Sequence, residues 1–187
     1  MTTTNRKTRD LIQCSLFTAL IAVGAFLRIP IPVLPFTLQF LFTTLAGLLL
    51  GPRQGTISVA AYLLLGLAGL PIFTEGGGFW YVLKPSFGYL IGFCVGTYLT
   101  GRLAEGFRKK TMGHYLMANF AGLAAVYVIG MVYYFIICNF VINAPIGLWP
   151  LVLYCFLLAV PGDILLSILA AIVAKRVQPV LARQHVH

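Results

Sequence analysis

Charged residues are scarce in this sequence, and acidic residues are scarcer still. Only 9% of the 187 residues are charged, and only four of them are Asp or Glu. A soluble domain is usually about 25% charged. Hydrophobic residues make up 60% of the chain, and the mean hydropathy is +0.95. This composition argues against a soluble protein and predicts an integral membrane protein in which residues 1–187 form a single membrane domain.

Several motifs that carry chemistry are also missing. No P-loop of the form GxxxxGK followed by Ser or Thr occurs, so the chain does not bind ATP by that route. The four cysteines lie in apolar stretches and form no CxxC pair, and the three histidines form no HxxxH or HExxH pattern. We therefore expect no metal site, no cofactor and no enzymatic activity.

Six hydrophobic stretches predict an all-α bundle of six transmembrane helices. The second and third are short, because sixteen residues of helix reach only about 24 Å. We expect these two to lie in a thinned or protein-buried position. The six predicted spans are Leu11–Leu27, Phe36–Gly51, Gly55–Leu70, Ser86–Leu103, Tyr115–Val141 and Leu151–Ala174.

The basic residues predict how these spans are oriented. With the N-terminus inside, eleven of the 13 Lys and Arg residues fall in cytoplasmic segments, and only Arg28 and Lys84 fall outside. This asymmetry predicts six spans with both termini in the cytoplasm. It also explains the net charge of +9, so this charge does not require that the protein binds nucleic acid. The predicted cytoplasmic cations are Arg6, Lys7, Arg9, Arg53, Arg102, Arg108, Lys109, Lys110, Lys175, Arg176 and Arg183.

One carboxylate, Asp163, lies far from any predicted membrane surface. An ionisable group at that depth costs about 2.5–3.5 kcal/mol on insertion scales, so it indicates a functional site with a polar partner. Pro161 and Gly162 precede it. One hypothesis is that Asp163 caps a half-helix beginning at Ile164. The other is that it accepts hydrogen bonds from a ligand inside the bundle, and the two are compatible.

Two predicted outside connections are candidates for covering a ligand. In Arg28–Pro35, three prolines favour a stiff, extended segment. In Pro71–Pro85, three glycines form a flexible hinge before Phe79, Trp80 and Tyr81. These aromatic residues either form a lid or belong to the interfacial belt. Lys84 either extends to the membrane surface or pairs with a ligand carboxylate.

Small residues form a face on the first span at three- and four-residue spacing, and such a face lets another helix approach closely. Its residues are Ser15, Thr18, Ala19, Ala22 and Ala25. Gly47, Gly51 and Gly55 form a similar surface, as do Gly92 and Gly96. Each surface is suited either to packing within the bundle or to docking a separate membrane subunit.

Five segments, in order, resemble the BioY family, the biotin-specific substrate-binding (S) components of energy-coupling factor (ECF) transporters. They cover most of Arg28–Gly101 and part of the last span. The segments are Pro35–Gln39, Leu45–Pro52, Tyr62–Pro71, Gly88–Phe93 and Pro161–Asp163.

The resemblance implies a six-helix S component of the bacterial cell membrane that binds biotin from outside. It also implies a transmembrane T component and two ATPase subunits as partners, with the first-helix face (Ser15, Ala19 and Ala22) contacting the T component. By the same resemblance, the first-loop residues Phe36, Thr37 and Gln39, the wall residue Tyr89 and the polar residue Asp163 bind the ligand.

The sequence departs from the family pattern where a lysine often follows the Pro-Gly-Asp motif. Here only Ile164 to Ile168 follow, and a lysine instead precedes the fourth span at Lys84. We hypothesise that Lys84 supplies the missing positive charge.

Biotin chemistry agrees with this assignment. Asp163 can accept the ureido N–H groups, Gln39 can donate to the carbonyl, and aromatic walls that include Phe36, Trp80 and Tyr89 suit the ring.

The alternatives are an S component for another vitamin, a stand-alone secondary transporter that uses Asp163 as a proton site, and a small membrane enzyme that uses it as an acid or base.

Overall fold

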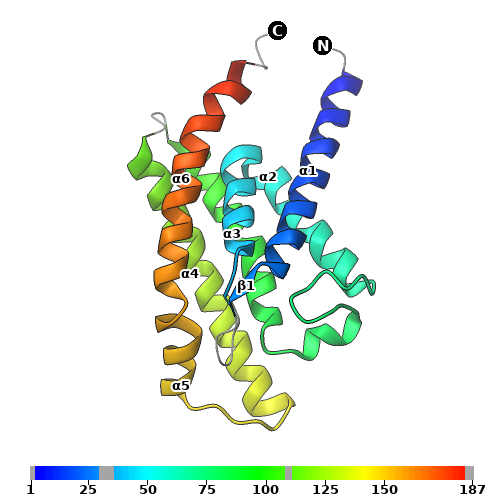
Figure 1. The fold of residues 1–187 in the computed structure, drawn as a ribbon, viewed down its shortest axis with the longest axis vertical. Helices are drawn as coiled ribbons and strands as arrows, with labels where there is room; N and C mark the ends of the chain where they lie inside the picture. Colours follow the sequence, from blue (N-terminus) through cyan, green and yellow to red (C-terminus); the bar gives the residue numbers. More distant parts are fainter. Residues whose placement is uncertain (1–2, 30–35, 108–110, 184–187) are drawn as a thin grey trace.

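Helices account for most of the chain in the computed structural model, which describes residues 3–29, 36–107 and 111–183 (Figure 1). Within these described ranges, four helices are long and apolar enough to cross a membrane: Lys7–Phe26, Gln39–Leu67, Met112–Val141 and Leu148–Gln178. The elements in chain order are α1 (Thr3–Phe26), β1 (Arg28–Ile29), β2 (Phe36–Thr37), α2 (Gln39–Leu67), η1 (Phe79–Leu83), α3 (Phe87–Gly106), α4 (Met112–Ile136), η2 (Ile137–Val141), α5 (Leu148–Val152), η3 (Leu153–Leu157) and α6 (Val160–Arg183).

The predicted second and third spans form the single element α2, which is broken at Gly51. Gly51 has a φ of 84°, a conformation that favours glycine, and Pro52 follows it. A straight helix would separate Gln39 from Tyr62 by about 34 Å. Their side chains instead form a 2.9 Å hydrogen bond, so the two halves of α2 fold back on each other as a helical hairpin. Within the described residues there are thus five long helical elements for the six predicted spans, because the second and third spans are the two halves of α2.

The other predicted spans correspond to single helical regions with shifted ends. The first and fourth are α1 and α3, and the fifth runs through α4 into the π-helical turn η2. The last combines α5, the π-helical turn η3 and α6. α1 begins and α6 ends at the same end of the molecule, and α5 lies at the opposite end (Figure 1).

Glycines bring the backbones of neighbouring helices into close contact inside the bundle. A Cβ at Gly92 or Gly96 of α3 would lie 2.8–2.9 Å from atoms of α4, and a Cβ at Gly47 of α2 would lie 2.7 Å from the carbonyl of Thr97. These two small-residue surfaces are therefore used for packing within the chain, and α3 packs extensively against both α2 and α4.

Of the small residues that form a face on α1, some are buried in the bundle and others are exposed on its surface. Thr18 and Ala25 are buried, and the Thr18 hydroxyl donates to the carbonyl of Ser58 on α2 at 3.0 Å. Ser15 and Ala19 are exposed and Ala22 is half-buried. The outward part of the face thus remains open to a partner helix.

The first predicted outside connection begins and ends in a short antiparallel pair. Arg28 pairs with Thr37, and Ile29 pairs with Phe36. The extended conformation predicted from Arg28 onward is therefore confirmed at residues 28 and 29. The three prolines lie outside the described residues. The pairing fixes Phe36 and Thr37 at the start of α2, beside the cavity described next.

Candidate functional site

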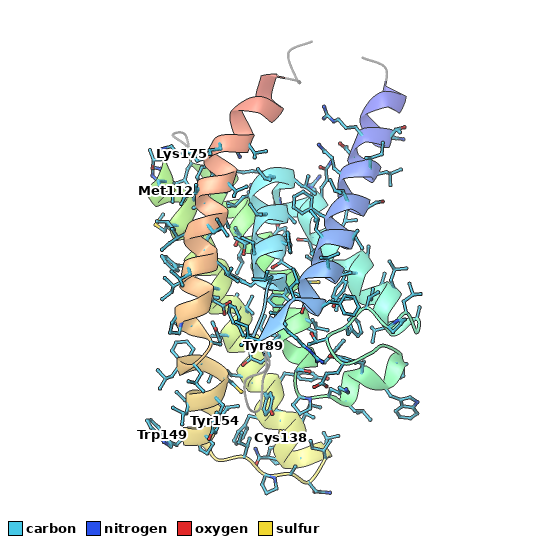
Figure 2. The ribbon with its side chains drawn as sticks, in the orientation of Figure 1. Tyr89, Met112, Cys138, Trp149, Tyr154 and Lys175 are labelled. Atoms are coloured by element: carbon cyan, nitrogen blue, oxygen red, sulfur yellow. The ribbon has the colours of Figure 1, made fainter. Side chains whose placement is uncertain are left out.

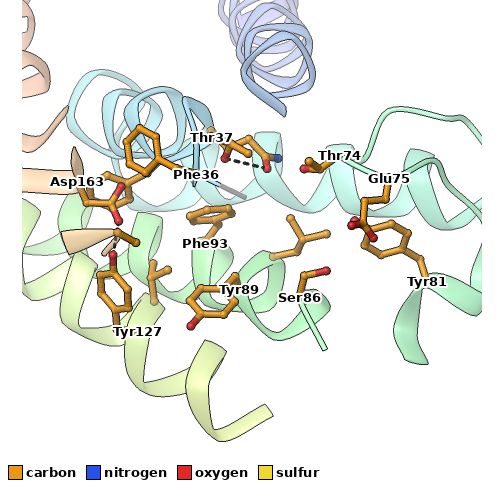
Figure 3. Close-up of a pocket in the computed structure, with 15 residues that line it drawn as sticks. Phe36, Thr37, Thr74, Glu75, Tyr81, Ser86, Tyr89, Phe93, Tyr127 and Asp163 are labelled. Atoms are coloured by element: carbon orange, nitrogen blue, oxygen red, sulfur yellow. Dashed lines mark hydrogen bonds between the residues drawn. The ribbon is translucent and has the colours of Figure 1, made fainter. Parts of the chain in front are cut away.

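A cavity of about 660 Å³, counting its open mouth, lies among α2, α3, α4, α6 and the segment before α3 (Figure 3). In Figure 2, Met112 and Lys175 lie near one end of the molecule and Trp149 near the other. Tyr89, which lines the cavity, lies between these ends. The lining residues are Phe36, Thr37, Gln39, Phe40, Thr74, Glu75, Tyr81, Ser86, Tyr89, Leu90, Phe93, Val126, Tyr127, Ala159 and Asp163.

Asp163 forms the polar end of this cavity. The Tyr127 hydroxyl donates a 2.5 Å hydrogen bond to its Oδ2 atom, and the two residues face each other from α4 and α6 (Figure 3). Oδ2 is thus held by the protein, and a carboxylate has further acceptor positions for a ligand. The carboxylate predicted to need a polar partner therefore has one, and it also lines a cavity.

The Pro-Gly-Asp motif forms the first turn of α6. The helix begins at Val160, and Pro161 occupies an early position where its missing N–H costs little. Asp163 lies within this first turn, and its N–H donates to the carbonyl of Ala159. The hypothesis that Asp163 caps a helix beginning at Ile164 is therefore wrong, because the helix has already begun at Val160, four residues before Ile164.

Gly162 leaves room for the ring of Phe36. A Cβ at Gly162 would lie 2.6 Å from ring atoms of Phe36, which is closer than real contacts allow. The ring therefore packs over the backbone beside Asp163 (Figure 3). This contact joins β2, just before α2, to the start of α6 at the cavity wall.

Gln39 is buried and is oriented by its neighbours. Its Nε2 atom donates to the Tyr62 hydroxyl at 2.9 Å, and its Oε1 atom accepts a hydrogen bond from Thr37 at 3.4 Å. The Tyr62 hydroxyl donates in turn to the carbonyl of Ile72 at 3.0 Å. This chain connects the cavity wall to the segment between α2 and α3. The second N–H of Nε2 has no hydrogen-bond partner among the described residues and could serve a ligand carbonyl.

Tyr89 supplies an aromatic wall. Its ring lies edge-to-face with Tyr127 at a centroid distance of 6.2 Å, and its hydroxyl donates to the carbonyl of Cys155 in η3 at 3.3 Å. Because the hydroxyl is bonded to η3, the ring is the part of Tyr89 offered to a ligand. This position suits the predicted wall role.

The segment between α2 and α3 closes another side of the cavity. Glu75 and Tyr81 line it, and burial raises the pKa of the Tyr81 hydroxyl, which therefore stays protonated at neutral pH. Lys84 pairs with Glu75 at 2.7 Å and lies 4.9 Å from the centroid of the Tyr81 ring. Neither Lys84 nor Trp80 lines the cavity, and Trp80 is 78% exposed. Five of the seven predicted ligand residues thus line the cavity. Lys84 does not, but it forms an ion pair with Glu75, which does.

Sequence reasoning missed Tyr127, Glu75 and Phe93 as cavity residues. A signal existed for Tyr127, because a hydroxyl in the middle of an apolar span needs a partner just as Asp163 does. Phe93 and Glu75 carried no signal that set them apart from other apolar or loop residues. Among the described residues, no group of His, Cys, Asp and Glu side chains could hold a metal ion.

Comparisons with known proteins agree on one family. The family model described as "BioY family" matches residues 1–183. A probable biotin transporter BioY from Lysinibacillus sphaericus is 40% identical, with 94% of this chain and 89% of that protein covered. A biotin transporter BioY from Thermotoga maritima is 38% identical, with 91% and 96% covered.

A solved structure is also similar in fold. The crystal structure of an S-component for biotin from an ECF-type ABC transporter superposes with a TM-score of 0.84. The two chains are 32% identical, and the match covers 96% of this chain and 95% of that one.

Proposed function

The chain belongs to the BioY family, and from this premise we propose that it is a high-affinity biotin-binding subunit that mediates biotin uptake with an ATP-driven ECF module. It is a transport protein rather than an enzyme, and it is a multi-pass protein of the bacterial plasma membrane. The assignment to a transport family also sets aside the membrane-enzyme alternative for Asp163.

One observation carries the proposal: Asp163 and Gln39, which are far apart in the chain, line one cavity. The ureido group of biotin has two N–H donors and one carbonyl. Asp163 can accept from an N–H with an oxygen position that Tyr127 leaves open, and Gln39 can donate to the carbonyl with its second N–H. A ligand without the ureido group would leave these buried groups unpaired, which gives selectivity.

The remaining lining suits the apolar parts of biotin. Phe36, Tyr89 and Phe93 present aromatic surface to the cavity, and such surface favours the sulfur-containing ring and the alkyl chain. Trp80 keeps its proposed ligand contact only if the segment that carries it closes further over the ligand. Its exposed position favours the interfacial role.

Lys84 remains our candidate for the ligand carboxylate. Its ammonium group is bound to the carboxylate of Glu75, which itself lines the cavity. A ligand carboxylate at this side would therefore compete with Glu75 for the same ammonium group or share it. Because the side chains of both residues are well exposed, at 40% and 46%, this exchange needs little desolvation.

Energy for uptake would come from partner subunits. We propose a transmembrane T component and two ATPases, since this chain carries no P-loop. The outward face of α1 formed by Ser15, Ala19 and Ala22 is our candidate for the contact with the T component, because small residues let a second helix approach closely.

The proposed topology has six membrane crossings with cytoplasmic termini. The helical hairpin α2 supplies two crossings, and α1, α3, α4 and the run from α5 to α6 supply the other four. In this arrangement the end of the molecule at which α1 begins and α6 ends faces the cytoplasm (Figure 1). The excess of Lys and Arg in the corresponding segments supports that orientation.

The test is equilibrium binding of biotin to the purified chain in detergent, with Asp163→Asn as the variant and Asp10→Asn as the matched control. We expect tight binding that thiamine and riboflavin do not displace. Asp163→Asn should weaken it about 10- to 100-fold, as expected for the loss of a charged acceptor, while Asp10→Asn leaves it unchanged. No biotin binding by folded protein would overturn the assignment. Displacement by another vitamin would identify an S component for that vitamin.

Transport separates the proposal from a stand-alone transporter. Biotin uptake by cells that express this chain should depend on the ATPase subunits. Uptake that persists at the same rate without any ATPase partner would instead support proton-coupled transport through Asp163.

A further inference from the structure

A second cleft lies where the turn of α2 meets the end of α3, away from the cavity that contains Asp163. It is lined by both polar and apolar side chains, among them Arg53, Gln54, Tyr98, Arg102 and Glu105. α3 ends shortly before Met112, which Figure 2 places at the same end of the molecule as Lys175. The cleft is therefore at the end that the proposed function assigns to the cytoplasmic surface.

Close helix packing brings the two arginines of this cleft together. A Cβ at Gly101 of α3 would lie 2.6 Å from the backbone nitrogen of Pro52, so the backbones of α3 and the α2 turn are in contact there. Arg53 directly follows Pro52, and Arg102 directly follows Gly101. Both are exposed, and within the residues that the structure describes neither guanidinium forms an ion pair.

Apolar side chains lead from the cleft toward the middle of the bundle along the same helix faces. On α3, Val95, Tyr98 and Arg102 follow each other at spacings of three and four residues, and Val95 and Tyr98 are 39% and 45% exposed. On α2, Ile57 is four residues after Arg53 and is 57% exposed. On each helix, an arginine near the end of the bundle is thus followed by exposed apolar side chains one or two turns further from that end.

Glu105 limits the positive charge of the cleft. Its carboxylate is directed to the α2 turn, where Oε1 would lie 2.6 Å from a Cβ at Gly51. With Arg53 and Arg102, the lining residues carry one net positive charge. A single phosphodiester, which carries one negative charge, matches this balance.

We propose that this cleft binds the phosphodiester headgroup of an anionic phospholipid in the cytoplasmic leaflet. The two guanidinium groups bind the phosphate oxygens, and an acyl chain lies along Tyr98 and Val95. Basic pockets between transmembrane helices on the cytoplasmic side bind anionic headgroups by this chemistry, and guanidinium groups match phosphate geometry. The inference rests on the proposed function only for the orientation of the chain in the membrane.

The test measures lipid affinity of the full chain without biotin. The purified protein in detergent is titrated with phosphatidylglycerol and, separately, with phosphatidylcholine of the same acyl chains. Binding is followed by native mass spectrometry. We expect a preference for phosphatidylglycerol of about tenfold or more, since each cation near a membrane surface contributes to anionic lipid binding. The double variant R53Q/R102Q should remove the preference, and R53K/R102K should retain most of it.

The matched control is K175Q/R176Q, which removes two cations from α6 at the same end of the molecule. It should keep the preference. No preference in the wild type, or equal loss in both double variants, would overturn the proposal. Displacement of the lipid by millimolar inorganic phosphate would show that the cleft binds phosphate alone, and would also overturn it. Biotin affinity, measured separately on R53Q/R102Q, should not change. A chain that prefers phosphatidylglycerol but binds no biotin would contradict only the proposed function.

Discussion

Tyr127 on α4 donates a 2.5 Å hydrogen bond to Asp163 on α6, and both residues line the same cavity. The phenol holds one carboxylate oxygen in a fixed position, so the other acceptor positions keep a defined direction toward a ligand. This pair combines a structural contact between two helices with a candidate ligand contact, and the first prediction separates the two roles.

Tyr127→Phe should weaken biotin binding about tenfold, because it removes a hydrogen bond to a charged group that orients Asp163. In the Asp163→Asn background the same change should cost much less. Isothermal titration of the four proteins gives the coupling energy. Equal losses in both backgrounds would show that Tyr127 does not act through Asp163. Tyr98→Phe, far from the cavity, is the control.

Gly162→Ala should lower both stability and biotin affinity. The added methyl group would overlap the Phe36 ring, and overpacking of this kind costs about 1–3 kcal/mol. Phe36→Leu added to Gly162→Ala should restore part of the unfolding midpoint. Gly113→Ala is the matched control, because a Cβ there meets nothing within 4 Å. The explanation fails if Phe36→Leu brings no recovery.

Tyr62→Phe should destabilise the protein by about 1–3 kcal/mol, because it leaves Gln39 and the carbonyl of Ile72 without their buried partner. Thermal unfolding in detergent measures the loss. Tyr154→Phe is a suitable control, since the Tyr154 hydroxyl makes no hydrogen bond in the described part of the chain. Biotin affinity should fall as well, because Gln39 loses its orientation. A melting temperature equal to that of wild type would contradict the role of Tyr62.

Lys84→Met should reduce affinity for biotin but not for biotin methyl ester, since only the free acid can pair with the ammonium group. Competition binding with the two ligands gives the ratio. Glu75→Gln should leave the preference for the acid intact, because it releases Lys84 from its ion pair. Lys175→Met, at the other end of the molecule, is the control. Unchanged affinity in Lys84→Met would rule out Lys84 as the ligand cation.

Cysteine labelling should show that Thr111 and Leu148 lie on opposite sides of the membrane. Both residues are exposed, and α4 with its π-helical extension separates them. On intact cells a membrane-impermeant maleimide should label Leu148→Cys, and it should label Thr111→Cys only after permeabilisation. The wild-type chain controls for its four native cysteines. The reverse pattern would invert the proposed topology.

The sequence predicted the helical regions well because long apolar stretches leave few alternatives in a membrane. It did not predict that two of them would form the one element α2. The two halves of α2 meet at a sharp turn at Gly51 and Pro52, and hydropathy alone does not show how closely two apolar stretches follow each other there. Likewise, the capping hypothesis for Asp163 placed a helix start too late, because a proline in the first turn of a helix looks the same in sequence as one that breaks a helix.

The candidate site was only partly predictable. Asp163 was found from the energetic cost of a charge in the membrane, and the Phe36–Gln39 segment from a family resemblance. Glu75 was not predicted, because nothing in a glycine-rich loop indicates which side chain turns inward. The position of Lys84 depends on its pairing with Glu75, a tertiary contact that spacing in the sequence does not specify.

The polar residues Gln39 and Asp163 of the cavity come from distant parts of the chain, and this has a consequence for biogenesis. Gln39 and Tyr89 have been synthesised by the time α3 is complete, whereas Asp163 belongs to α6, which is synthesised after α3 and α4. A nascent chain arrested after α4 therefore contains most of the apolar wall but lacks the carboxylate. Under the proposed function, the chain becomes able to bind biotin only when α6 joins the other helices.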